Sequence, residues 1–129
     1  HHSNIVPWQM LCEKNGTVLK VIPCDDQGEL VLSELDSLVT DRTKVVSIGH
    51  VSNAIGTVND IDRVFAAAKN VGAVTILDAA QSAPHMSINP IDIGCDFLTF
   101  SGHKTYGPTG AGVLWGKLEK LEKLPPLRE

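Results

Sequence analysis

Residues 60–78 read D-I-D-R-V-F-A-A-A-K-N-V-G-A-V-T-I-L-D, and this stretch decides the fold of the 129-residue chain. Its first part places apolar side chains at the spacing of one helix face, and Gly72 is suited to end that helix. The continuous apolar run from Ala73 to Leu77 then predicts a buried strand that ends at Asp78. The predicted helix face consists of Ile61, Val64, Phe65, Ala68 and Val71.

Three more short apolar runs surround this helix and strand, at residues 44–48, 96–100 and 112–115. Strands that alternate with a helix through short connections indicate parallel pairing, with helices packed on the sheet. The sequence therefore predicts an α/β fold with a three-layer, mostly parallel sheet. A chain of this length is sufficient for one domain with one core.

The segments upstream of these runs are predicted from their local chemistry. Ser3 or Asn4 is expected to cap a helix that reaches about residue 15, where a glycine follows. Residues 17–23 are rich in β-forming side chains. Residues 33–39 are expected to form a short helix that is capped by its first residue, a serine.

Composition and charge exclude several classes of protein. The net charge of −4, without a Lys/Arg cluster, argues against nucleic-acid binding. No apolar run approaches the roughly 20 residues of a membrane-spanning helix, and no signal-peptide pattern opens the chain. Cys12, Cys24 and Cys95 are widely spaced and lack zinc-site spacing, which favours a reducing, cytoplasmic compartment. Residues 117–123 alternate in charge and are interpreted as a solvated face.

Polar side chains follow three of the predicted strands. Ligands of open α/β sheets bind beyond the carboxyl ends of the strands, so these side chains are expected to share one edge. A lysine at such an edge is either a phosphate binder or a covalent amine, although a single exposed loop lysine would have no such role. The side chains in question are His50, Ser52, Asn53, Asp78, Gln81, Ser101, His103 and Lys104.

Three other motif interpretations explain fewer of these residues. Ser101 and Lys104 match S-x-x-K, but that chemistry needs a helix, and here a strand precedes and a Gly/Pro stretch follows. A Ser101, His85 and Asp78 triad lacks the G-x-S-x-G elbow of hydrolases. A nucleotide-binding α/β module would need a phosphate loop, and the sequence has none.

A pyridoxal 5'-phosphate (PLP) site explains more of them at once. PLP needs an amine for its aldehyde and an acid at its pyridine nitrogen. It also needs donors for its phosphate and a partner for its phenolic oxygen. Lys104, Asp78, Ser101 with His103, and Gln81 would meet these four needs in that order.

Four segments in register resemble one known family, the group II (SufS-like) cysteine desulfurases of the class V aminotransferase family. The resemblance spans nearly the whole chain, and it identifies the opening His-His pair as native rather than as a tag remnant. The segments are H-H-S-N-I-V-P-W-Q (1–9), H-V-S-N-A-I-G-T (50–57), D-A-A-Q-S-A-P-H (78–85) and D-F-L-T-F-S-G-H-K-T-Y-G-P-T-G-A-G (96–112).

The resemblance implies a role in PLP binding for each matching residue. Lys104 is implied to form the Schiff base and to move the substrate α-proton. Asp78 is implied to face the pyridine nitrogen, and Gln81 the phenolic oxygen. Ser101 and His103 are implied to bind the phosphate.

The resemblance also implies a fold and two further residue roles. His1 is implied to stack on the cofactor ring and assist proton transfers, and Asn53 to contact the substrate carboxylate. Residues 1–129 would form part of the large domain of the type I PLP-dependent transferase fold, without its N-terminal part and its small C-terminal domain. In that fold the strand at residues 110–115 is antiparallel to its neighbours.

The implied activity is conversion of L-cysteine to L-alanine, with an enzyme persulfide that passes sulfur to an acceptor protein for iron–sulfur cluster assembly. The full-length protein would be a homodimer. The family's catalytic cysteine lies downstream of the lysine, so none of the three cysteines here is assigned to it. Residues 1–129 alone are therefore expected to lack turnover and to expose apolar surface.

Two alternatives remain open on the sequence alone. The chain is also compatible with selenocysteine lyase or another class V aminotransferase-family enzyme, because the lysine segment does not separate these. A non-catalytic remnant that binds only a cofactor or a partner is the second alternative.

Overall fold

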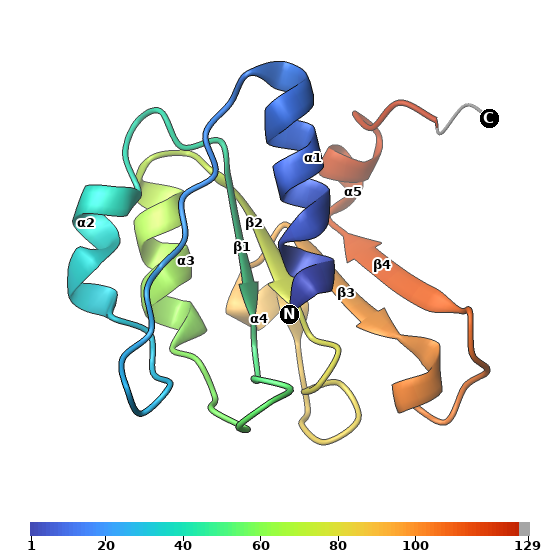
Figure 1. Cartoon of the computed structure of the whole chain (residues 1–129). Helices are drawn as coiled ribbons and strands as arrows, with labels where there is room; N and C mark the ends of the chain where they lie inside the picture. Colours follow the sequence, from blue (N-terminus) through green and yellow to red (C-terminus); the bar gives the residue numbers. More distant parts are fainter. Residues whose placement is uncertain (127–129) are drawn as a thin grey trace.

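The computed structural model describes residues 1–126, and a four-stranded sheet lies at its centre (Figure 1). The strand order follows the sequence, with three parallel strands and an antiparallel last one. This arrangement confirms the predicted α/β fold, the mostly parallel sheet and the reversed final strand. The strands are β1 (Val45–Gly49), β2 (Val74–Asp78), β3 (Phe97–Ser101) and β4 (Gly112–Gly116).

Helix α3 (Ile61–Asn70) covers one face of the sheet and builds the core. Asp60 caps it, since a carboxylate oxygen accepts the Arg63 N–H at 3.0 Å. The predicted face is confirmed, because Ile61, Val64, Phe65 and Ala68 are all buried, and Val71 packs partly against them. Alternate strand residues complete this core, namely Val46, Ile48, Leu77 and Leu98.

Helix α1 (Val6–Asn15) lies over the opposite face of the sheet (Figure 1) and buries none of its residues. The predicted Ser3 or Asn4 cap is wrong, since Ile5 is the cap residue and contributes no side-chain hydrogen bond. The Asn4 Oδ1 instead accepts hydrogen bonds from the Trp8 indole at 2.9 Å and the Ser47 hydroxyl at 2.6 Å. Asn4 therefore fastens the N-terminal segment to β1.

The other local predictions hold only in part. The segment 17–23 forms no strand, because only a single bridge, between Cys24 and Leu30, pairs this region. Ser33 lies inside a 3₁₀ turn, η2 (Leu32–Glu34), which leads into α2 (Leu35–Leu38). Two short helices were not predicted, α4 (Pro90–Ile93) and α5 (Leu118–Leu121).

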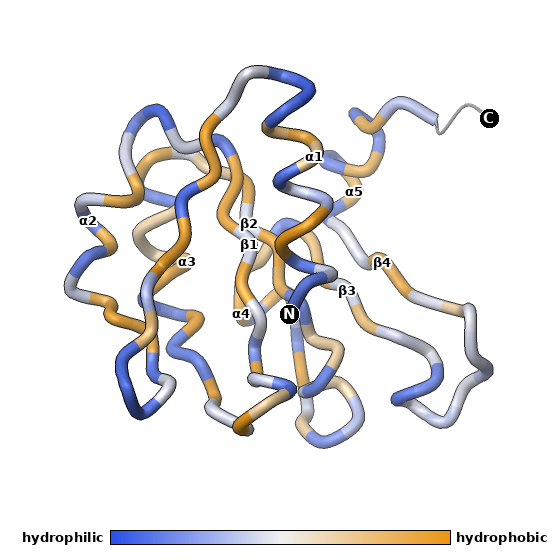
Figure 2. Tube along the Cα trace, in the orientation of Figure 1, coloured by the Kyte–Doolittle hydropathy of each residue, from blue (hydrophilic) through white to orange (hydrophobic). Residues whose placement is uncertain are grey.

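Apolar residues are distributed unevenly over the two faces. Figure 2 shows them along the strands and α3, and also on α1. On α1 several of them are exposed, including Met10 at 66% and Leu11 at 47%. None of the helices in residues 1–126 has the length and apolar character needed to cross a membrane.

Candidate active site

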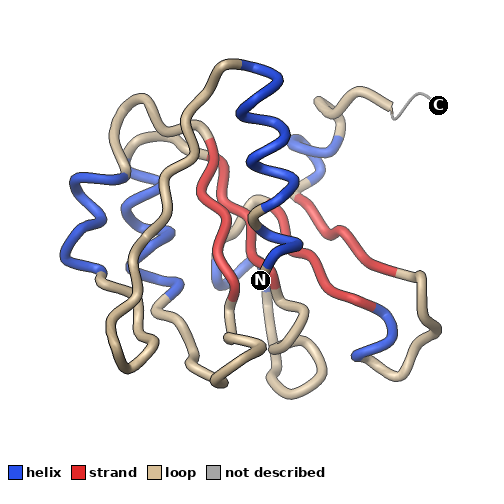
Figure 3. Tube along the Cα trace, viewed as in Figure 1, coloured by secondary structure: helices blue, strands red, loops and turns tan. Residues whose placement is uncertain are grey.

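The site lies where the three parallel strands end. Figure 3 shows loops leaving the sheet at that edge, and a cavity of about 670 Å³ opens between them. All of the residues predicted for cofactor or substrate binding line this one cavity, as the strand-end rule requires. They are His1, Asn53, Asp78, Gln81, Ser101, His103 and Lys104.

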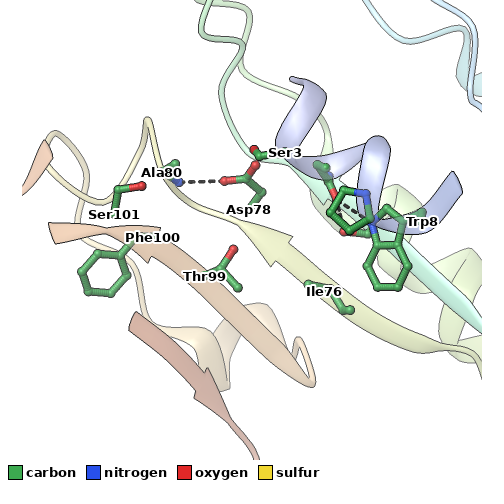
Figure 4. Close-up of a pocket in the computed structure, with 11 residues that line it drawn as sticks. Ser3, Trp8, Ile76, Asp78, Ala80, Thr99, Phe100 and Ser101 are labelled. Carbon is green, nitrogen blue, oxygen red and sulfur yellow. Dashed lines mark hydrogen bonds between the residues drawn. The ribbon is translucent and has the colours of Figure 1, made fainter. Parts of the chain in front are cut away.

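Asp78 is the last residue of the central parallel strand, in register with Gly49 of β1 and Thr99 of β3. Its side chain is half-buried, and Oδ1 accepts the Ala80 N–H at 3.0 Å (Figure 4). Among the described residues, Oδ2 has no hydrogen-bond partner. One carboxylate oxygen is thus oriented by the backbone, and the other is available to a ligand.

Lys104 follows β3 by one short turn, η3 (Gly102–Lys104). Ser101 ends the strand and is half-buried, as is Lys104, whereas His103 is exposed. Within residues 1–126 the Lys104 ammonium makes no ion pair. A half-buried amine without a counter-ion is suited to a covalent or charge-assisted bond with a ligand.

His1 lines the cavity and is the N-cap residue of the turn η1 (His2–Asn4). Its Nδ1 accepts the Ser3 N–H at 3.2 Å and lies 2.7 Å from the Ser3 hydroxyl. The ring is exposed, and its centroid is 4.0 Å from that of His2. Since Asn4 holds η1 against β1, the same bonds fix the approach of His1 to the cavity.

Asn53 occupies the tip of a small loop that begins where β1 ends. A bridge between Val51 and Val58 closes the loop, and the Ser52 N–H donates to the Thr57 carbonyl at 2.9 Å. The side-chain amide of Asn59 stabilises the base of the loop, because it donates a hydrogen bond to the Gly49 carbonyl at 2.7 Å. The exposed amide of Asn53 therefore projects from an ordered support.

His50 is the one strand-end side chain that does not line the cavity. It is only 8% exposed, and its buried Nδ1 has no hydrogen-bond partner within residues 1–126. Gly49 and Val51 line the cavity on either side of it, so strand alternation turns His50 to the other face. Burial lowers the pKa of His50, and the Asp62 carboxylate opposes that shift.

Several cavity residues were not predicted. Cys24 and Leu30 enter from the loop before α2, and Asn59 enters from the loop after β1. Nothing in their local sequence marks them, because they reach the cavity through tertiary packing. Cys95 is buried, as expected for a small core residue, and burial raises the pKa of its thiol.

A second, smaller cavity of about 290 Å³ lies between α1 and the sheet (Figure 4). Trp8 and Pro7 line it on the helix side, and Ile76 and Thr99 on the sheet side. It shares Asp78 with the larger cavity. The carboxylate thus borders both cavities.

The Aminotransferase class-V family model matches residues 1–129. The chain belongs to this family. It is 50% identical over 126 residues to a probable cysteine desulfurase of Mycolicibacterium paratuberculosis, covering 98% of this chain and 18% of that protein. It is 46% identical over 126 residues to a cysteine desulfurase of Pectobacterium carotovorum, covering 98% and 31%.

Two solved structures resemble the fold of this class-V chain. The cysteine desulfurase CsdA of Escherichia coli superposes with a TM-score of 0.90 at 39% identity, over 95% of this chain and 31% of that one. The apo cysteine desulfurase of Thermococcus onnurineus gives 0.90 at 44% identity, over 99% and 32%. These matches confirm the predicted resemblance to cysteine desulfurases. The chain spans less than a third of the length of these relatives.

Class-V aminotransferases depend on PLP, and the residues of the cavity fit that cofactor chemically. A primary amine, a carboxylate with a free oxygen, a side-chain amide and hydroxyl and imidazole groups face the same space. These are the functional groups that PLP binding requires.

Proposed function

We propose that the protein is a PLP-dependent cysteine desulfurase of the SufS-like type, and that Lys104 carries the cofactor. The observation that supports this proposal is the single cavity shared by Lys104, Asp78 and Gln81, which come from two different strand ends. The identity of about half of the residues to cysteine desulfurases supports the substrate, L-cysteine.

The cofactor would be held from several sides. Lys104 would bind it covalently, and Asp78 would face its pyridine nitrogen with the oxygen that Ala80 leaves free. Ser101 and His103 would donate to its phosphate. Gln81, His1 and Asn53 would contact the phenolic oxygen, the ring face and the substrate carboxylate, respectively.

Bound PLP supplies an electron sink for negative charge at the substrate α-carbon. The Asp78 carboxylate would accept a hydrogen bond from the pyridine nitrogen and so favour the form of the ring that carries a proton there. The Lys104 amine removes and returns the α-proton, and the His1 imidazole assists proton transfer at the rim. Asn53 orients the substrate through its carboxylate.

The reaction ends in sulfur transfer. A cysteine thiolate of the full-length protein attacks the substrate sulfur, and the carbon–sulfur bond breaks with its electron pair on carbon. Protonation of that carbon yields L-alanine, and the sulfur remains on the enzyme as a persulfide. We propose that a sulfur-acceptor protein receives it for iron–sulfur cluster assembly, and that the enzyme acts as a cytoplasmic homodimer.

The decisive experiment locates the covalent cofactor. Protein incubated with PLP should develop a visible absorbance band, and borohydride reduction followed by peptide mass spectrometry should place the adduct on Lys104. Lys104→Ala should abolish both signals. Lys14→Ala, at an exposed lysine of α1, should leave both unchanged.

Asp78→Ala should weaken PLP binding roughly 10-fold to 100-fold, the loss expected for one charge-assisted hydrogen bond. An adduct on a different lysine would refute the assignment. Alanine release from L-cysteine, compared with that from L-selenocysteine, would then separate a desulfurase from a selenocysteine lyase. The same assay on residues 1–129 alone checks the expected lack of turnover.

A further inference from the structure

The turn that carries Lys104 closes on a single carbonyl group. The Gly102 oxygen accepts the Thr105 N–H at 2.9 Å, the Gly107 N–H at 2.8 Å and the Thr105 hydroxyl at 3.0 Å. Two of these three bonds come from Thr105, the residue directly after the lysine. The path of the backbone at Lys104 therefore depends on how firmly Thr105 holds that oxygen.

The turn has few other restraints. It is a single 3₁₀ turn without a side-chain cap. Among the side chains of residues 101–107, only the Thr105 hydroxyl donates a hydrogen bond to another described residue, to the Gly102 carbonyl at 3.0 Å and to the Ser101 carbonyl at 3.5 Å. The Gly102 N–H donates to the Ala111 carbonyl at 2.9 Å and ties the turn to the following loop. Gly107 approaches closely, since a Cβ there would lie 2.9 Å from the Gly102 oxygen.

The next residue, Tyr106, adds strain to the same turn. Its φ is +62°, a conformation that residues with a Cβ rarely adopt, and no other non-glycine residue in 1–126 has a positive φ. The Tyr106 side chain is fully exposed, so it gains no packing energy to offset that strain. The bonds to Gly102 on either side must hold the conformation.

We propose that Thr105 is a positioning residue for Lys104. Its hydroxyl, through the bond to the Gly102 carbonyl, fixes the backbone of the lysine and hence the reach of the amine into the cavity. Thr105 does not line the cavity, so it acts through its neighbour. The inference rests on the proposed role of Lys104, whose amine must return to one position in each catalytic cycle.

The test compares three substitutions in the full protein. Thr105→Val removes the hydroxyl and keeps the shape, Thr105→Ser keeps a hydroxyl, and Thr109→Val makes the same change at an exposed threonine of the next loop. The first readout is the rate at which acetic anhydride labels Lys104 in cofactor-free protein, relative to Lys14 in the same molecule. The second is the pH midpoint of the visible absorbance after addition of PLP.

Thr105→Val should raise the relative labelling of Lys104 about threefold to tenfold, the range that one net hydrogen bond provides. It should also shift the pH midpoint, whereas Thr105→Ser and Thr109→Val should match the unchanged protein. Should Thr105→Val fail to fold, Thr105→Ala replaces it with a smaller side chain.

Unchanged labelling of Lys104 in Thr105→Val would overturn the proposal. Labelling of Lys104 in Thr105→Ser that is as fast as in Thr105→Val would also overturn it. Equal acceleration at every lysine would also overturn it, because that pattern indicates general loosening of the fold. If the unchanged protein forms no adduct with PLP, the proposed function fails, but the labelling of the cofactor-free protein still decides the role of Thr105.

Discussion

The strand ends form two opposite rims of the sheet, and each rim carries an aspartate and a lysine. The two pairs differ in the hydrogen bonds and ion pairs that they make. At the edge where β3 begins, the Asp96 carboxylate binds the Lys117 ammonium at 2.9 Å and accepts the Thr75 N–H at 3.0 Å. At the edge where β2 ends, Asp78 accepts one backbone N–H and forms no ion pair with Lys104 among residues 1–126.

The difference separates a structural pair from a functional one. Asp96 is 8% exposed, and its hydrogen-bonding capacity is used to join β2, β3 and the end of β4. Asp78 and Lys104 line the cavity and keep unused hydrogen-bonding capacity, which costs some stability of the fold. Hydrogen-bond partners, rather than residue type, therefore distinguish a group that holds the fold from one that awaits a ligand.

The most direct test of this difference between Asp96 and Asp78 is to remove each carboxylate in turn. Asp96→Ala leaves the Lys117 ammonium and the Thr75 N–H without their partner, and should lower the free energy of unfolding by about 3 kcal/mol. Asp78→Ala should lower it by about 1 kcal/mol or less, because only the Ala80 N–H loses a bond and water can replace it. Urea denaturation measures both, and equal losses would refute the distinction.

The fold was predictable because its signals are local. The helix face that begins at Ile61 is periodic over a few residues, and its burial follows that periodicity. The run that ends at Leu77 is apolar without a break, and it forms the central strand of the sheet. The strand-end rule brought Lys104 and Asp78 to one cavity for the same reason. It failed at His50, where strict alternation along the strand should have taken precedence.

The contacts that were missed join residues far apart in the sequence. Lys117 was interpreted as part of a solvated face, but it pairs with Asp96, 21 residues earlier. Ser3 or Asn4 was predicted to cap a helix, but the Asn4 side chain accepts a hydrogen bond from Ser47, 43 residues later. Each of these side chains makes its hydrogen bond to a residue far away in the sequence, and the local sequence pattern does not reveal such a partner.

Acid titration sharpens the comparison of the two edges. Burial favours a higher pKa for Asp96, but the bonds from Thr75 and Lys117 outweigh it, and the pKa lies below its ordinary value of 3.8. The stability that Asp96 provides is therefore present above that value and is lost as the pH falls through the lower, folded-state pKa. Protonation should destabilise less than Asp96→Ala, because the protonated side chain keeps its shape.

His50 should contribute an earlier step of the same sign. Burial lowers its pKa from 6.5, so the unfolded chain binds a proton more readily, and stability should begin to fall as the pH drops below 6.5. Urea denaturation at a series of pH values measures both steps. His50→Leu should flatten the first and Asp96→Asn the second, and a profile unchanged by either substitution would refute this account.

The most local expected effect concerns the hydrogen bond from Ser47 to Asn4, which holds the N-terminal segment near the edge of the sheet where β2 ends. Ser47→Ala removes the hydroxyl that donates to Asn4 at 2.6 Å, while Asn4 keeps its bond from Trp8. The free energy of unfolding should fall by about 1 kcal/mol, with Ser33→Ala, at an exposed serine, as the matched control.

Loss of this bond should speed amide hydrogen exchange near the N-terminus more than in the rest of the fold. The N–H groups of Asn4 and Ile5, which donate to the carbonyls of His1 and His2, should exchange with solvent deuterium about fivefold faster in Ser47→Ala. Exchange in β2 and α3 should not change. Unaltered exchange in residues 1–5 would mean that the Asn4 bond does not hold His1 at the cavity, and that the open edge relies on other contacts for its order.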